Sequence, residues 1–99
     1  MSAEPPEPTV EELMEQIRAI ELGQFLLSTA ATLASLAYGK LEARDLAEAR
    51  LGIDAMSALV PLLPAGIDAE ARRGVEQALA GLKLAYADDV AASSSEATE

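Results

Sequence analysis

The sequence contains no cysteine, no histidine and no tryptophan. Without cysteine the chain can form neither a disulfide nor a thiolate nucleophile. Without histidine it lacks the commonest general base and a principal zinc ligand. Disulfide scaffolds, zinc sites and serine–histidine–aspartate triads are therefore excluded. We expect no catalytic residue, no metal and no cofactor in this chain.

Aromatic residues make up only 3% of the chain, although hydrophobic residues make up 51%. The three aromatic residues are Phe25, Tyr38 and Tyr86. The interior must therefore be built from aliphatic side chains and alanine, which suit closely packed helices. With 99 residues, the chain has the size of one small domain.

Positive charge is missing from both ends of the chain. Residues 1–16 carry five acids and residues 88–99 carry four, and neither segment has a lysine or arginine. Residues 17–87 carry eight acids and seven bases, a net charge of −1, so most of the formal net charge of −10 belongs to the ends. A secretory signal needs a positively charged start before an apolar run. We therefore expect a cytoplasmic protein.

The few bases also bear on nucleic-acid binding, which needs clustered positive charge to neutralise phosphates. Only Arg72 and Arg73 are adjacent, and Glu70 and Glu76 flank them. We expect no nucleic-acid partner.

The fold class indicated by the sequence is all-α, a small antiparallel three-helix bundle with acidic ends. Residues 1–8 are acidic and rich in proline, and residues 91–99 are serine, alanine, threonine and glutamate, so both segments are expected to be disordered. Residues 9–90 are expected to form the helical domain. If the first helix breaks near Gly23, residues 9–22 and 23–38 form two helices and the bundle has four.

The first helix has a well-marked start. Thr9 precedes Glu12 by three residues, the spacing of a capping box, and apolar residues follow at intervals of three and four. From Leu22 to Gly39 no residue is charged, and apolar or small side chains surround the whole helix. Five polar residues oppose a transmembrane interpretation of this segment: Gln24, Ser28, Thr29, Thr32 and Ser35.

The second helix is expected to begin at Asp45, which has Glu48 three residues later, and to stop near Val60 because Pro61 follows. Gly39 is the expected C-cap of the helix before it. The predicted inward seam consists of Leu46, Ala49, Ile53, Met56, Val60 and Leu63.

The third helix is expected over about residues 69–90, with Asp68 as its cap. Its large apolar positions are Val75, Leu79, Leu82 and Tyr86. A second stripe, of small residues, lets another helix approach closely. That stripe consists of Gly74, Ala78, Gly81 and Ala85.

A helix that is apolar all round needs cover on more than one side. We therefore predict homodimerisation, or binding of another helical protein, through the first or the third helix. The predicted interface residues are Leu22, Leu26, Leu33, Leu36, Gly74, Ala78, Gly81 and Ala85.

Arg50 and Asp54 are four residues apart and are expected to form a structural ion pair along the helix. An enzyme that uses the carboxylates of Asp54 and Glu48 is an alternative hypothesis, but no second acid, base or nucleophile is positioned with them. A membrane-peripheral helical protein is the other alternative to an interaction module.

Three segments resemble a family of short bacterial proteins known as domain of unknown function 1844. They are FLLSTAATLASLAYGKL (25–41), DLAEARLGIDAMSALVPLL (45–63) and ALAGLKLAYAD (78–88). The resemblance implies a small all-helical protein and brings no activity, substrate or binding residue with it. Many members have a longer polar loop before the third helix than residues 64–70 provide.

Overall fold

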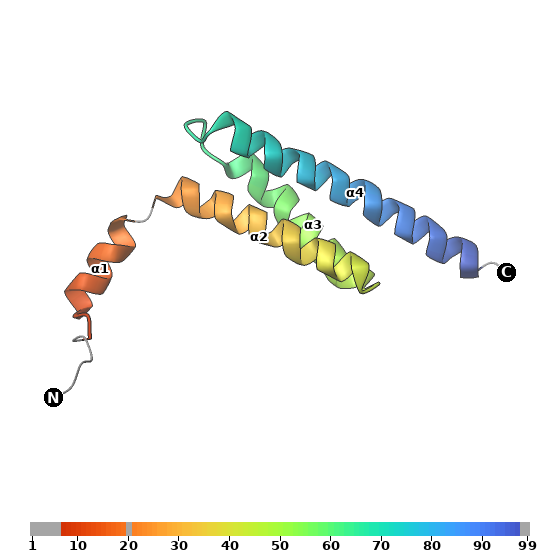
Figure 1. The fold of residues 1–99 in the computed structure, drawn as a ribbon, viewed down its shortest axis with the longest axis horizontal. Coiled ribbons are helices and arrows are strands. Elements are labelled where there is room, and N and C mark those ends of the chain that lie inside the picture. The colour runs from red at the N-terminus through yellow and green to blue at the C-terminus, as the bar shows by residue number, and fades with distance from the viewer. Residues whose placement is uncertain (1–6, 20, 98–99) are drawn as a thin grey trace.

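The computed structural model describes residues 7–19 and 21–97 and is helical throughout its regular elements (Figure 1). No strand occurs in these ranges, so the predicted all-α class is confirmed. The elements are α1 (Val10–Ala19), α2 (Leu22–Glu42), α3 (Leu46–Leu59), the short 3-10 helix η1 (Val60–Leu62) and α4 (Ala69–Ala97).

Helix α1 begins with the capping box that the sequence predicts. The backbone N–H of Glu12 donates to Oγ1 of Thr9 at 3.1 Å, and the N–H of Thr9 donates to Oε2 of Glu12 at 3.3 Å. Two otherwise unpaired donors of the first turn are satisfied in this way. No residue of α1 is buried.

Helices α1 and α2 are separate, and the break lies before Gly23 rather than at it. Gly23 belongs to the first turn of α2. A Cβ at this position would lie 3.0 Å from Cγ of Pro64, which is closer than side chains normally approach. The glycine therefore allows α2 to pack against the loop before α4.

The connection from α2 to α3 corrects the expected C-cap at Gly39. Helix α2 passes through Gly39 and ends at Glu42, and Arg44 takes the left-handed conformation with φ 63°. The N–H of Arg44 donates to the carbonyl of Leu41, and the N–H of Asp45 donates to that of Lys40. These bonds form a Schellman motif with arginine where glycine is usual.

The predicted helix starts at Asp45 and Asp68 are confirmed. A carboxylate oxygen of Asp45 accepts from the N–H of Glu48 at 3.2 Å, and one of Asp68 accepts from the N–H of Ala71 at 3.1 Å. The predicted stop near Val60 is also confirmed, because Pro61 lies in η1 directly after α3.

The interior lies among α2, α3 and α4, which pack against one another. Helices α2 and α4 run in the same direction, and α3 runs in the opposite direction (Figure 1). Met56 of α3 and Leu82 of α4 are the largest fully buried side chains. The predicted seam, which runs from α3 through η1 to Leu63, is buried except for half-buried Leu46. The buried apolar residues are Ala30, Ala34, Ala37, Leu41, Ala49, Ile53, Met56, Val60, Leu63, Ile67, Val75 and Leu82.

Helix α2 turns three alanines and Leu41 toward the interior. Ala30, Ala34 and Ala37 are buried, whereas Leu22 and Leu36 of the predicted interface are exposed. Short side chains let helix backbones approach closely. Gly52 of α3 completes this contact, because a Cβ there would lie 3.1 Å from Cβ of Ala37.

The C-terminal segment also differs from the expectation. The sequence places the end of the last helix near Val90 and a disordered tail over 91–99, but α4 continues through Ala97. Alanine, frequent in this segment, has the highest intrinsic helix propensity, which favours continuation of the helix. Of the arm expected over residues 1–8, only residues 7 and 8 are described, and they are exposed and not helical. Residues 1–6 and 98–99 lie outside the described residues.

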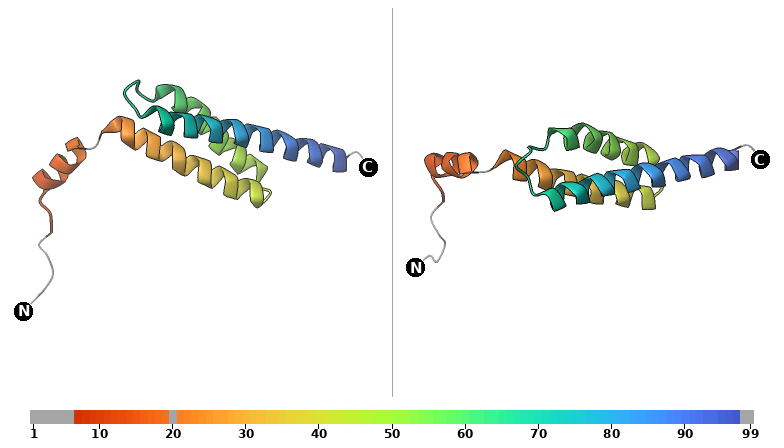
Figure 2. Two further views of the ribbon diagram at one scale, coloured as in Figure 1. Left: turned by 45° about the horizontal axis from the view of Figure 1, so that its top comes forward. Right: turned by 90° about the horizontal axis from the view of Figure 1, so that it is seen from above.

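Helix α1 stands apart from the other helices, as all views show (Figures 1 and 2). The radius of gyration is 19.1 Å, whereas a compact domain of this length has about 13 Å. The difference reflects the projecting α1 and the length of α4.

Candidate association surface

One surface with exposed apolar side chains lies on α2 and α3. Leu22 and Leu36 of α2 are 73% and 58% exposed, and Leu51 of α3 is 64% exposed. Phe25 is also exposed. We call these four residues, with half-buried Leu33, the α2–α3 face. Phe25 and Leu51 were not among the predicted interface residues, although Phe25 lies in the uncharged segment that pointed to one.

A groove between α2 and α3 crosses this face. Its volume is about 170 Å³, and Leu33, Leu36, Leu51 and Ala55 line it, with Lys40 and Glu48 as its charged lining residues. A cavity of about 150 Å³ lined by aliphatic side chains accepts a molecule the size of benzene. The groove therefore has room for one large aliphatic side chain.

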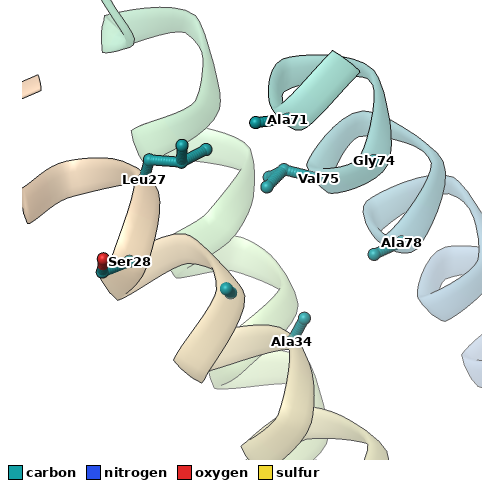
Figure 3. Close-up of a pocket in the computed structure, with 8 residues that line it drawn as sticks. Leu27, Ser28, Ala34, Ala71, Gly74, Val75 and Ala78 are labelled. Atoms are coloured by element: carbon teal, nitrogen blue, oxygen red, sulfur yellow. The ribbon is translucent and has the colours of Figure 1, made fainter. Parts of the chain in front are cut away.

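A second groove of about 450 Å³ lies between α2 and α4 (Figure 3). Leu27 of α2 and Val75 of α4 point toward each other across it, and Ala78 borders it (Figure 3). Ser28 carries the one hydroxyl of its lining, and no charged side chain lines it. The groove thus offers shape and apolar surface, but no set of polar groups that would orient a reacting molecule.

The predicted small-residue stripe of α4 is partly used within the same chain. A Cβ on Gly81 would lie 3.1 Å from the hydroxyl of Tyr38, and half-buried Ala78 and Ala85 pack against the interior. Gly74 is exposed, and a Cβ there would meet no atom within 4 Å. Ala78, Gly81 and Ala85 therefore face α2 of the same chain, which leaves the α2–α3 face as the better candidate for contact with another molecule.

Helix α1 carries a second exposed apolar surface, which we call the α1 stripe. It consists of Val10, Leu13, Met14 and Ile17, and none of these is buried. The polar side of α1 is acidic, with Arg18 as its one base. Ile17 borders a hollow of about 400 Å³ together with Leu22 and Phe25 of α2, so the α1 stripe and the α2–α3 face meet at the bend between the helices.

The predicted pair of Arg50 and Asp54 lies on the exposed side of α3. Nε of Arg50 lies 3.6 Å from Oδ2 of Asp54. A hydrogen bond to the Tyr86 hydroxyl, and then the charge of Asp54, raise the pKa of Arg50 above its ordinary value. The guanidinium therefore stays charged. An exposed pair of this kind contributes little to stability.

The carboxylates of Glu48 and Asp54 do not converge on a reaction centre. Glu48 and Asp54 are six residues apart on one helix, so they lie on different sides of it. Across residues 7–19 and 21–97 there is no group of three or more acidic, histidine or cysteine side chains placed to hold a metal ion.

Comparison with known proteins gives no match to this chain, whether with family models, with curated proteins or with solved structures. The resemblance to the domain of unknown function 1844 family therefore stays a prediction.

Within the described part of the chain, none of the helices is both long enough and apolar enough to cross a membrane by itself. Taken as a pair, α1 and α2 meet the length and composition criteria, but they are bent by 79°.

Proposed function

We propose that α2, α3 and α4 form an antiparallel three-helix bundle that works as a non-enzymatic self-association module. A second copy of the chain is its partner, and the α2–α3 face is the contact surface. The observation that carries this proposal is the exposure of Leu22, Phe25 and Leu36 within the uncharged segment 22–39, together with that of Leu51 on α3.

The size of the α2–α3 face supports association. Its exposed apolar surface is on the order of 500 Å², the size of the largest apolar patch on a typical soluble monomer, and such a patch is often functional. Transfer of that surface out of water is favourable by about 25 cal/mol per Å² before the costs of association are subtracted. Two faces related by a two-fold axis would be self-complementary, since both partners use the same residues.

The first test is the mass of the full chain in solution. Light scattering behind size exclusion at micromolar concentration should give twice the chain mass of 10.3 kDa. The double variant Leu36→Glu and Leu51→Glu places two charges in the contact, so we expect the dissociation constant to rise at least tenfold.

Leu84→Glu is the matched control, because Leu84 is 66% exposed on α4 and away from the α2–α3 face. It should leave the dissociation constant unchanged, and circular dichroism should show equal helicity for all variants. A single-chain mass for the native protein, or an equal loss with Leu84→Glu, would reject the proposed surface.

A membrane-peripheral role is the second candidate, and the exposed α1 stripe is the observation that favours it. Amphipathic helices that lie on membranes usually carry lysine and arginine on the polar side. Helix α1 carries glutamates there instead. Sedimentation with neutral and with anionic vesicles separates the two candidates, because the association module should stay in the supernatant with both.

A further inference from the structure

The groove between α2 and α3 is apolar along its length and nearly balanced in charge at one end. Lys40 and Glu48 are its charged lining residues. Glu42, Arg44 and Asp45 belong to the adjacent end of α2 and the turn that follows, so two bases stand among three acids there. Covering a surface of this kind with a charged segment costs desolvation that no clear excess of opposite charge repays. The groove therefore favours an uncharged, apolar occupant.

We propose that this occupant is the start of α2 from a second copy, so that two chains pair through antiparallel α2 helices and each places Leu22 between Leu36 and Leu51 of the other. This inference rests on the proposed self-association and adds its orientation and its register. Segment 22–39 has no charge, and Leu22 and Phe25 at its start are exposed. The groove has a volume of about 170 Å³, which suits one leucine side chain.

The spacing along α2 defines the register. Residues 22, 25, 29, 33 and 36 follow one another at intervals of three and four, so they share one side of the helix. Antiparallel pairing of two segments 22–39 over their full length brings residue 22 level with residue 39 of the other copy, and residue 25 level with residue 36. Leu22 then lies over the groove of the other copy, and Phe25 packs against Leu36.

Two simpler arrangements leave the groove empty. Within one chain Leu22 and Leu36 are separated by about 21 Å along the same helix, so Leu22 cannot reach its own groove. Parallel pairing sets Leu22 beside Leu22 and Lys40 beside Lys40 of the other copy, and both grooves then lack an occupant. Antiparallel pairing fills both grooves with the same residue, as a two-fold axis requires.

Gly39 supports this register. It lies inside α2 and is exposed, and a Cβ at this position would make no packing contact within 4 Å. Glycine inside a helix is less favourable than alanine, and packing within the chain gives no reason for it here. In the antiparallel pair Gly39 faces the start of the other α2, where the missing side chain leaves room for Leu22 and Phe25.

The middle of the pairing contains hydroxyl groups that already have partners. Thr29 of one copy lies level with Thr32 of the other. Oγ1 of Thr29 donates to the carbonyl of Phe25 at 2.9 Å, and Oγ1 of Thr32 donates to that of Ser28 at 3.0 Å. Burying a hydroxyl is costly when it lacks a hydrogen bond, and these two keep theirs. The contact can therefore close over its centre.

The first test uses the absence of cysteine, because introduced cysteines then report which residues are neighbours. Chains with Leu22→Cys and chains with Leu51→Cys are oxidised separately and as a mixture, and an affinity tag on the Leu22→Cys chains distinguishes the products by size. We expect the mixture to give disulfide-linked pairs of one tagged and one untagged chain. Each variant alone should link poorly, because the two copies of residue 22 lie about 25 Å apart, too far for a disulfide.

The second test keeps every leucine of the face. Gly39→Leu fits within its own chain, because nothing packs there, but it occupies the space that Leu22 and Phe25 of the other copy need. It should raise the dissociation constant of the dimer at least about tenfold. Gly74→Leu is the matched control, because Gly74 is also helical, exposed and without packing contacts, but lies on α4. It should leave the dissociation constant unchanged, and circular dichroism should show equal helicity for both variants.

The antiparallel inference is overturned if Leu22→Cys alone links as readily as the mixture does, since that result means parallel pairing. It is also overturned if the native chain has the mass of a dimer and Gly39→Leu has the same dissociation constant as Gly74→Leu. In both cases the proposed self-association stands. A single-chain mass of the native protein at every concentration rejects both proposals.

Discussion

Helices α1 and α3 begin with the same kind of cap, but the apolar side of α3 is buried and that of α1 is not. Each starts with a capping residue, Thr9 or Asp45, followed three residues later by glutamate, and each carries apolar residues at intervals of three and four. In α3 these residues are buried, with Met56 fully so, whereas in α1 none is buried. Local sequence therefore specifies that a helix forms, but not whether its apolar side is covered.

The connections to α2 account for the difference. A Schellman motif at Arg44 turns the chain within residues 43–45 and lays α3 against α2. At the other end of α2, the chain bends by 79° and α1 points away. Only the first connection brings an apolar stripe onto an apolar surface of the same chain.

The largest expected effect on stability comes from methionine, which occurs in both α3 and α1. Met56→Ala removes a fully buried side chain from α3, so it should lower the free energy of unfolding by about 2–5 kcal/mol. Met14→Ala removes a side chain of α1 that is 45% exposed, so it should change the free energy by about 0.5 kcal/mol or less. Urea denaturation followed by circular dichroism measures both.

Both variants are compared at the lowest protein concentration that gives a signal, because association raises the apparent stability by mass action. Equal losses for the two methionine variants would mean that α1 is as much a part of the packed unit as α3, and the contrast between the two helices would be lost.

The caps of α1 and α3 allow a similar comparison, with a smaller expected effect on stability. Asp45→Ala removes the side-chain acceptor at the start of α3, and such a loss costs about 1 kcal/mol of stability. Thr9→Ala should instead reduce the helical signal of α1 and leave the urea midpoint of the packed helices unchanged, since α1 contributes no buried residue. A lower midpoint with Thr9→Ala would show that the folding of α1 is coupled to that of the other helices.

The smallest expected effect concerns the turn between α2 and α3. Arg44 has a positive φ, which is unfavourable for any residue with a Cβ. Arg44→Gly relieves this strain, although glycine loses more backbone entropy on folding. We therefore expect the free energy of unfolding to rise by about 0.5 kcal/mol. The urea midpoint should rise slightly. A lower midpoint would show that the arginine side chain stabilises the turn by more than its backbone costs.

The sequence predicts the helix starts well, because short-range chemistry determines them. Thr9, Asp45 and Asp68 each have a side chain that accepts a backbone N–H from the third residue after them, and these bonds form in the structure. Pro61 predicts the end of α3 for an equally local reason, since it has no N–H and a fixed φ.

Features that depend on packing were less predictable. Helix α2 is apolar all round, so its periodicity could not show that Ala34 and Ala37 face inward while Leu22 and Leu36 face outward. A glycine usually occupies the left-handed position after a helix, so Gly39 was the natural choice for the C-cap, but Arg44 takes that conformation. Hydrogen bonds donated by the N–H groups of Arg44 and Asp45 compensate for the strain.

The candidate surface was predictable in part. The uncharged segment of α2 pointed to Leu22 and Leu36, and both are exposed. The sequence could not predict the exposure of Leu51. This single leucine lies beside the predicted inward seam, and its exposure depends on where α2 lies. The small residues of α4 were assigned to an intermolecular contact, and Ala78, Gly81 and Ala85 face α2 of the same chain instead.

The alanine contact between α2 and α3 limits how the sequence can vary. Ala37 and Gly52 are already among the smallest residues, so almost every replacement at these positions adds volume, and added volume in a tight contact costs about 1–3 kcal/mol. A large buried residue such as Met56 can be replaced by side chains that are smaller or that have a different shape. Divergent copies of this chain should therefore keep small residues at 37 and 52 long after the larger interior residues have changed.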